Sequence, residues 1–127
     1  MHIKTQGLIL RETNYKEADK ILTVLTREGG RRTVKARGCR RKNSPLAASA
    51  QLLAWSDMTL FAYRDRLTLN EAEALELFWG VRADVEKLAL ASYFAEVTEA
   101  VAEEGRPDPA LLSLALNSLY ALDKLQR

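Results

Sequence analysis

The fold is decided by the stretch KILTVLTREGGRRTVKARGCRRK, residues 20–42. Residues 20–26 are mostly apolar or β-branched, which is typical of a strand. Glu28-Gly29-Gly30 then offers the positive backbone φ angles that a tight hairpin turn requires. Residues 31–37 alternate between polar and apolar side chains, as a half-buried strand does. The stretch therefore predicts a β-hairpin within a sheet or barrel.

The second strand of this hairpin and the loop after it are strongly basic. Residues 31–42 contain seven cationic side chains and no anionic one. Lys35 and Arg37 share one face of the strand, and Val34 and Ala36 share the other. A charged strand face beside a charged loop predicts binding of a polyanion through its phosphates, although a solvated surface with no ligand is the alternative. The candidate binding residues are Arg31, Arg32, Lys35, Arg37, Arg40, Arg41 and Lys42.

Composition restricts the class of protein. The chain has 127 residues, of which 47% are hydrophobic and 28% charged, as in ordinary soluble globular proteins. It contains no run of about 20 apolar residues that would span a bilayer, so we expect a cytoplasmic protein with no membrane contact.

Residues 1–45 carry a net charge of +8 and residues 46–127 a net charge of −6. The N-terminal part suits phosphate, whereas the acidic C-terminal part suits structural support or protein docking.

Further strands are predicted on both sides of the hairpin. Residues 2–12 have strand character, and residues 51–64 form a second long strand. Residues 67–71 continue the period of two before helix-forming residues begin near Ala74. Residues 46–50 form no more than a helical turn, which we expect to plug or cross a barrel.

Five strands with a small helical element between the third and the fourth describe an OB-fold, a partly open barrel that often binds oligonucleotides. A bulge or bend at Gly7 would suit a barrel strand. An SH3-like barrel has a similar number of strands and is the alternative. The predicted fold class is therefore α+β, with a five-stranded OB-fold barrel followed by helices.

The sequence becomes helical from Val81 onward. Apolar residues recur at spacings of three and four up to Gly105, which is expected to end the first helix. The apolar face of that helix comprises Val85, Leu88, Leu90, Ala91, Phe94, Ala95, Val97 and Val101. Asp108-Pro109 then caps and starts a second helix. Leucines cover nearly the whole circumference of residues 110–125, so we expect a truncated helical domain or a dimer that supplies the missing neighbours.

The aromatic side chains have two interpretations. Trp55, Phe61 and Tyr63 are possible base-stacking residues if they face outward, because aromatic rings on an OB-fold surface stack on nucleic-acid bases. Packing in the core is the alternative, since large aromatic residues mostly fill interiors. Trp79 lies where the barrel would meet the helices and is predicted to be a packing residue.

Other reactive side chains are interpreted as structural. Cys39 and His2 are the single cysteine and the single histidine, so neither an internal disulfide nor a Cys/His zinc site is expected, and no cofactor is predicted for this chain. Neighbouring cations would lower the pKa of Cys39, but no catalytic partner is adjacent in sequence. Glu17 and Asp19 are expected to make turn contacts or to pair with Lys20.

Several short motifs occur in an order and spacing that resemble one family. They are Gly7-Leu8-Ile9-Leu10, Tyr15-Lys16-Glu17-Ala18-Asp19-Lys20-Ile21, Thr26 with Gly29-Gly30, Lys35-Ala36-Arg37-Gly38 and Arg40-Arg41-Lys42-Asn43-Ser44. Together they resemble the N-terminal region of the bacterial DNA repair and recombination mediator RecO. The likeness extends through the strand after Gln51 and the following helices to the end of the chain.

The resemblance implies an OB-fold domain over residues 1–79 and part of a helical domain over residues 80–127. It implies a bacterial, nucleoid-associated protein that binds single- and double-stranded DNA, anneals complementary strands and catalyses no chemistry. It also implies cooperation with RecR, contact with single-stranded DNA-binding protein, and loading of RecA at gaps in the RecF pathway. Many members carry a cysteine-ligated zinc element further along the chain, and this sequence has no counterpart of it.

Two functions of other classes remain open from the sequence alone. The acidic, leucine-rich helices would suit a protein-interaction adaptor that uses the barrel only as a scaffold. An OB-fold with a basic surface would also suit an RNA-binding module of the translation apparatus, since the 2′-hydroxyl is what separates RNA from DNA recognition.

Overall fold

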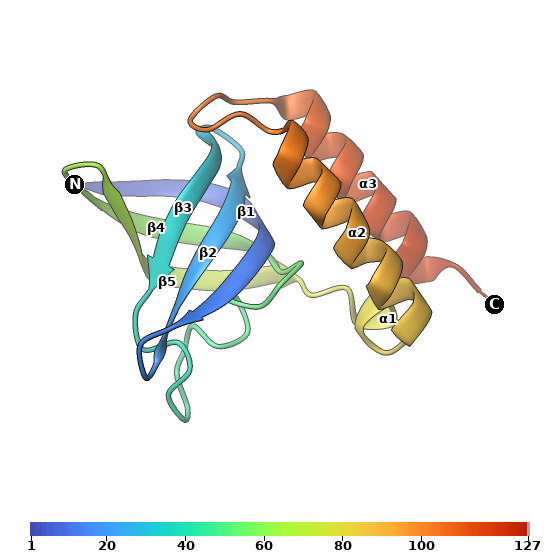
Figure 1. Cartoon of the computed structure of the whole chain (residues 1–127), viewed down its shortest axis with the longest axis horizontal. Coiled ribbons are helices and arrows are strands. Elements are labelled where there is room, and N and C mark those ends of the chain that lie inside the picture. The colour runs from blue at the N-terminus through green and yellow to red at the C-terminus, as the bar shows by residue number, and fades with distance from the viewer. Residues whose placement is uncertain (127) are drawn as a thin grey trace.

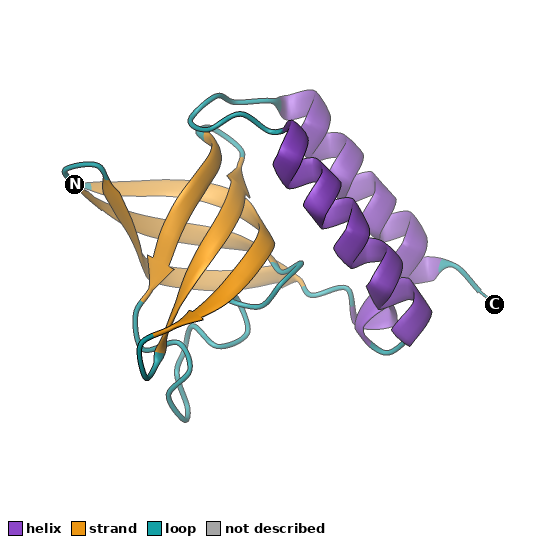
Figure 2. Ribbon diagram, in the orientation of Figure 1, coloured by secondary structure: helices purple, strands orange, loops and turns teal. Residues whose placement is uncertain are grey.

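The structure of the protein is a computed structural model that describes residues 1–126 (Figure 1). Within these residues five strands are followed by three helices (Figure 2). The strands are β1 His2–Tyr15, β2 Asp19–Thr26, β3 Gly30–Ala36, β4 Trp55–Tyr63 and β5 Arg66–Glu76. The helices are α1 Trp79–Arg82, α2 Val85–Val101 and α3 Pro109–Lys124.

The five strands form a closed barrel in the order β1-β2-β3-β5-β4. Neighbouring strands are antiparallel except for β3 and β5, which run parallel where Val34 and Lys35 pair with Leu67 and Thr68. The barrel closes because β1 pairs with β4 as well as with β2. A closed five-stranded barrel followed by helices confirms the predicted OB-fold and the predicted fold class.

The hairpin that decides the fold is present as β2 and β3. Its turn lies at residues 27–29, and Gly30 follows with a φ of 66°. A side chain at Gly30 would collide with the backbone of Arg106, which connects α2 to α3. Glycine is therefore required here both for its φ angle and for the close approach of the helical connection.

The predicted alternation of β3 is confirmed. Val34 and Ala36 are fully buried inside the barrel, whereas Lys35 is half-buried and Arg37, just after the strand, is exposed. Residues 44–54 form turns rather than a helix, yet Leu46 joins the barrel core, so this segment closes the barrel as expected. The barrel core also contains Ile9, Leu22, Val24, Ala50, Ala54, Met58, Leu60, Leu67 and Leu69.

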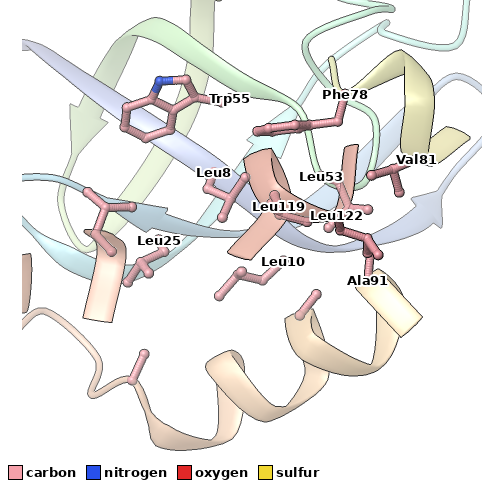
Figure 3. Packing of buried hydrophobic residues seen from close by; sticks show 13 residues of the cluster. Leu8, Leu10, Leu25, Leu53, Trp55, Phe78, Val81, Ala91, Leu119 and Leu122 are labelled. Carbon is pink, nitrogen blue, oxygen red and sulfur yellow. The ribbon is translucent and has the colours of Figure 1, made fainter. Parts of the chain in front are cut away.

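A second core lies between the outside of the barrel and the helices (Figure 3). Leu8 and Leu10 of β1 point toward the helices, while Ile9 between them points into the barrel. Both faces of β1 are therefore buried after Gly7, so apolar side chains follow one another there without a bulge. The bulge predicted at Gly7 is wrong. The register of β1 against β2 shifts between Ile9 and Arg11 instead. Gly7 is needed because a side chain would lie 2.5 Å from Val24 Cγ1.

The last helix starts where the sequence predicts, whereas the helical stretch predicted from Val81 onward is divided into the short α1 and the longer α2, which begins at Val85. Asp84 caps α2 by accepting hydrogen bonds from the backbone of Glu86 and Lys87. Asp108 caps α3 by accepting from Leu111 N at 3.1 Å, and Pro109 occupies the first turn. Other boundaries also differ from the prediction. β1 extends to Tyr15, and α2 ends at Val101 rather than at Gly105. β4 begins only at Trp55, and β5 continues to Glu76 because its pairing with β4 outweighs the helix preference of its last residues.

Two predictions about the helical part are wrong. Trp79 is 66% exposed, because it stands on the outer side of the single turn α1 and Phe78 takes the buried position instead. Most residues of the predicted apolar face of α2 are also exposed, namely Val85, Leu90, Phe94, Val97 and Val101. No neighbour covers this face in the described part of the chain. Among residues 1–126 no helix has the length and apolar character that a membrane span needs.

Candidate nucleic-acid interface

A groove of about 750 Å³ runs across the outside of β3, between the β1–β2 turn and the β4–β5 turn. These two turns and the surface of the second and third strands are where OB-folds bind oligonucleotides. The groove places Lys35 and Arg37 beside Arg66, which comes from the start of β5. The residues that line it are Tyr15, Ile21, Thr33, Lys35, Arg37, Phe61, Tyr63, Asp65, Arg66, Leu67, Thr68 and Asn70.

Three aromatic rings are accessible in this groove. Tyr15 is 41% exposed, Phe61 38% and Tyr63 61%. Lys35 Nζ lies 5.6 Å from the centroid of the Tyr15 ring, within the range of a cation–π contact. The groove therefore combines rings that can stack on bases with cations that can contact phosphates.

The basic stretch is divided between the two ends of β3. At the helical end, Arg31 Nη1 donates to the Glu99 carbonyl at 2.9 Å, and Arg32 forms an ion pair with Glu104 at 3.5 Å. The Arg31 carbonyl also accepts from Gly105 N at 3.0 Å. These two arginines hold the helices against the barrel, and the structure does not bring them together with the groove.

At the other end of the barrel, Arg40, Arg41 and Lys42 form an exposed basic loop, residues 38–42. Figure 1 shows this segment at the end of the barrel opposite the α2–α3 connection. Arg40 N donates to the Ala18 carbonyl at 2.9 Å, which ties the loop to the β1–β2 turn. The basic loop and the groove therefore share the β1–β2 turn as a common border.

Trp55 is not a base-stacking residue. It is 6% exposed and belongs to the core between the barrel and the helices (Figure 3). The guanidinium of Arg27 lies 5.5 Å from the centroid of its ring. This part of the sequence prediction is wrong because Trp55 opens β4 on the side that faces the helices, whereas Phe61 and Tyr63 lie at the far end of the same strand.

The structural role predicted for Cys39 is confirmed by its place in the barrel core, but the expected lowering of its pKa is wrong. The side chain is 3% exposed, and burial raises the pKa of the Cys39 thiol, an effect that outweighs the opposing influence of Lys20 and Arg40. The surrounding cations therefore do not activate the thiol. Asp19 does not pair with Lys20, which instead pairs with Glu12 at 2.7 Å. The Oδ1 of Asp19 accepts a hydrogen bond from Gly38 N at 2.7 Å, 19 positions further along the chain, rather than from a residue of its own turn.

Sequence reasoning missed Tyr15 and Arg66 as groove residues, and Lys16 beside them. The sequence indicates only a polar connection at Tyr15 and Lys16, and only a turn at Arg66. A signal was present: Tyr15 ends β1 and Arg66 begins β5, next to the two turns that an OB-fold places beside its ligand surface. Among residues 1–126 no group of three or more histidine, cysteine or acidic side chains is arranged to hold a metal ion.

Comparison with known proteins agrees with this architecture. Residues 1–78 match the family described as "Recombination protein O N terminal", and residues 82–127 match "Recombination protein O C terminal". The chain is 38% identical over 126 residues to the DNA repair protein RecO of Acetivibrio thermocellus, covering 99% of this chain and 50% of that protein. It is 38% identical over 124 residues to the RecO of Alkaliphilus metalliredigens, covering 98% and 50%.

A third relative, the RecO of Caldicellulosiruptor bescii, is 36% identical over 122 residues, or 96% of this chain and 50% of that protein. The chain thus spans about half the length of these relatives. Both family matches fall in the order in which the barrel and the helices follow each other here. The chain belongs to the RecO family of DNA repair proteins, of which it carries the N-terminal barrel and part of the C-terminal region.

Proposed function

We propose that this chain binds single- and double-stranded DNA without sequence specificity, as part of a protein that mediates DNA repair and recombination in the bacterial cytoplasm. The observation that carries the proposal is the groove in which Lys35, Arg37 and Arg66 lie beside Tyr15 and Tyr63. Such a pairing of cations with accessible rings suits a strand whose phosphates and bases are held together. Binding alone accounts for this role, with no catalysis and no cofactor in this part of the chain.

The groove and the basic loop would act on different parts of the nucleic acid. In the groove, cations contact phosphates while rings stack on bases, and neither contact reads a base edge. The basic loop offers Arg40, Arg41 and Lys42 without an aromatic ring among residues 38–42, which suits phosphates of either a single strand or a duplex. Arg31 and Arg32 contribute less, because acidic and carbonyl groups of the helical part already hold them.

The same geometry supports a role in annealing. A strand that is held through its backbone and through the faces of its bases keeps its pairing edges free for a complementary strand. We propose that the full-length protein anneals DNA in this way and, with RecR and single-stranded DNA-binding protein, helps to load RecA at gaps. These partners come from the family resemblance, and the groove accounts only for the DNA contacts.

A salt titration tests the proposal. The affinity for a fluorescent single strand and for a matched duplex is measured between about 50 and 300 mM salt, with an RNA strand of the same sequence as competitor. Affinity is expected to fall steeply with salt, because each neutralised phosphate releases condensed counterions. A slope near zero would contradict phosphate binding, and stronger competition by RNA than by DNA would favour the RNA-binding function.

Replacing Tyr63 by alanine is expected to weaken single-strand binding while leaving the salt dependence unchanged. Stacking of one base on an aromatic ring contributes about 1–3 kcal/mol, and a tyrosine carries no charge that would release counterions. Tyr63 is 61% exposed, so stability should change little. Tyr93→Ala is the matched control, because Tyr93 on α2 is equally exposed at 61% and lies outside the groove. Equal affinities of the two variants would exclude stacking on Tyr63.

A protein-interaction adaptor is the second candidate function. It is favoured by the exposed apolar side chains of α2 and α3, among which Val97, Val101 and Leu114 line an apolar cavity of about 470 Å³. Purified RecR is the probe: binding that survives high salt, in a protein without measurable DNA affinity, would replace the first proposal. If Val97→Glu leaves DNA binding unchanged, the first proposal stands.

A further inference from the structure

Asp19 is a carboxylate inside the most basic region of the surface. It begins β2, is half-buried, and follows the turn that carries Lys16. A negative charge at this place lowers the positive potential that attracts phosphate. If DNA binds here, the carboxylate therefore acts against binding unless it performs another task.

The contacts of Asp19 show what that task is. Its Oδ1 accepts a hydrogen bond from Gly38 N at 2.7 Å, at the point where β3 has ended and the basic loop begins. Gly38 has a φ of 69°, a left-handed conformation that only glycine adopts without strain. A hydrogen bond from a backbone N–H to a carboxylate is stronger than one to a neutral acceptor. Asp19 thus fixes the first residue of the loop in one of the several backbone conformations that are open to glycine.

Neighbouring contacts join the same two segments. Arg40 N donates to the Ala18 carbonyl at 2.9 Å, and Arg40 Nη1 donates to the Lys16 carbonyl at 3.3 Å. Cys39 between them is buried at 3% exposure and anchors the loop to the barrel core. Three successive loop residues are therefore held from the β1–β2 turn or the core, while Arg41 and Lys42 remain exposed.

We propose that Asp19 is a positioning residue for DNA binding, which presets the backbone of the basic loop so that Arg40, Arg41 and Lys42 lie beside the groove. This inference rests on the proposed DNA-binding function and deepens it. Pre-ordering the loop lowers the entropy that binding would otherwise lose. The gain from this order exceeds the electrostatic cost of one carboxylate among the cations.

Two substitutions separate order from charge. Asp19→Asn removes the charge but keeps an oxygen that accepts from Gly38 N, whereas Asp19→Ala removes both the charge and the acceptor. If Asp19 acted only by its charge, both variants would bind DNA more tightly and by the same factor. If Asp19 positions the loop, Asp19→Ala binds DNA more weakly than the parent, whereas Asp19→Asn does not.

The experiment is a single-strand titration of the whole chain at two salt concentrations, with thermal unfolding measured for each variant. Asp19→Ala is expected to bind about three- to tenfold more weakly, which is the loss of about one hydrogen bond, and with a shallower salt dependence because fewer cations are in place. Asp19→Asn is expected to bind as tightly as the parent or about twofold more tightly. Equal tightening in both variants would overturn the positioning role.

Gly38→Ala provides a second approach that alters no charge. The new Cβ would have space, with Arg41 Cδ at 3.6 Å, but alanine disfavours a φ of 69°. Binding is expected to weaken as in Asp19→Ala, and unchanged binding would contradict the need for this loop geometry. A parent chain that binds no DNA would refute the proposed function itself. A parent that binds DNA, together with equal DNA affinities of Asp19→Ala and Asp19→Asn, would refute only the role of Asp19.

Discussion

The triple variant Lys35→Gln, Arg37→Gln and Arg66→Gln is expected to bind single-stranded DNA about two to three orders of magnitude more weakly than the parent at 50 mM salt. These are the three cations that line the groove. Each phosphate contact to a single strand contributes about 0.7 to the slope of log affinity against log salt, so the slope should become shallower by about 2. Fluorescence anisotropy over a series of salt concentrations measures both quantities.

The control is a second triple variant with the same change in net charge. Lys4→Gln, Arg106→Gln and Lys124→Gln remove three cations at exposed positions that do not line the groove. A general attraction between a positive protein and DNA would weaken both variants alike. A groove that contacts phosphates directly predicts a large loss in the first variant and a small one in the second. Similar losses would contradict the position of the interface while leaving DNA binding itself intact.

The part of this interface that sequence could predict is the part that lies on one strand. Alternation with a period of two follows from strand geometry, so burial of Val34 and exposure of Arg37 needed no knowledge of the remaining chain. Arg66 reaches the groove through the parallel pairing of β3 with β5, which joins residues more than 30 positions apart. No local pattern in the sequence encodes that pairing.

Errors in the prediction arose where the helices cover the barrel. Trp55 and Phe61 lie on one strand, but the helices bury the first and leave the second accessible. Arg31 belongs to the same basic run as Arg37, yet it donates to the carbonyl of Glu99, 68 positions away. A basic run indicates that a surface favours anions, but the run itself does not show which of its members an acidic neighbour already holds.

The division into domains at residues 79 and 80 stays a prediction, and the packing raises the question of whether the two parts unfold separately. The second core takes Leu8 and Leu10 from the barrel and Leu119 and Leu122 from α3. This second core is therefore shared: the buried apolar side chains of the helices belong to it, whereas the barrel also has the core inside it. Arg11 adds a charged contact across the same boundary, since its Nη2 lies 2.7 Å from Glu99 Oε2.

Phe78→Ala is expected to lower the free energy of unfolding by about 3–5 kcal/mol, the usual cost of removing a buried phenylalanine ring. Phe78 is fully buried between barrel and helices (Figure 3). Its ring and the Tyr120 ring form an edge-type contact at a centroid distance of 5.1 Å. Its φ of 56° is unfavourable for phenylalanine and alanine alike, so the backbone contributes little to the difference. Urea unfolding followed by circular dichroism measures the change.

The adjacent aromatic residue is the control for Phe78. Trp79 is 66% exposed, so Trp79→Ala should change stability by no more than about 0.5 kcal/mol. Because Phe78 belongs to the core that the barrel and helices share, its loss should weaken both parts, and helical and strand signals should still unfold in a single transition. The opposite outcome is that the helices unfold first while the barrel remains as stable as in the parent. It would show that the barrel is complete without the helices and that the shared core stabilises only the helical part.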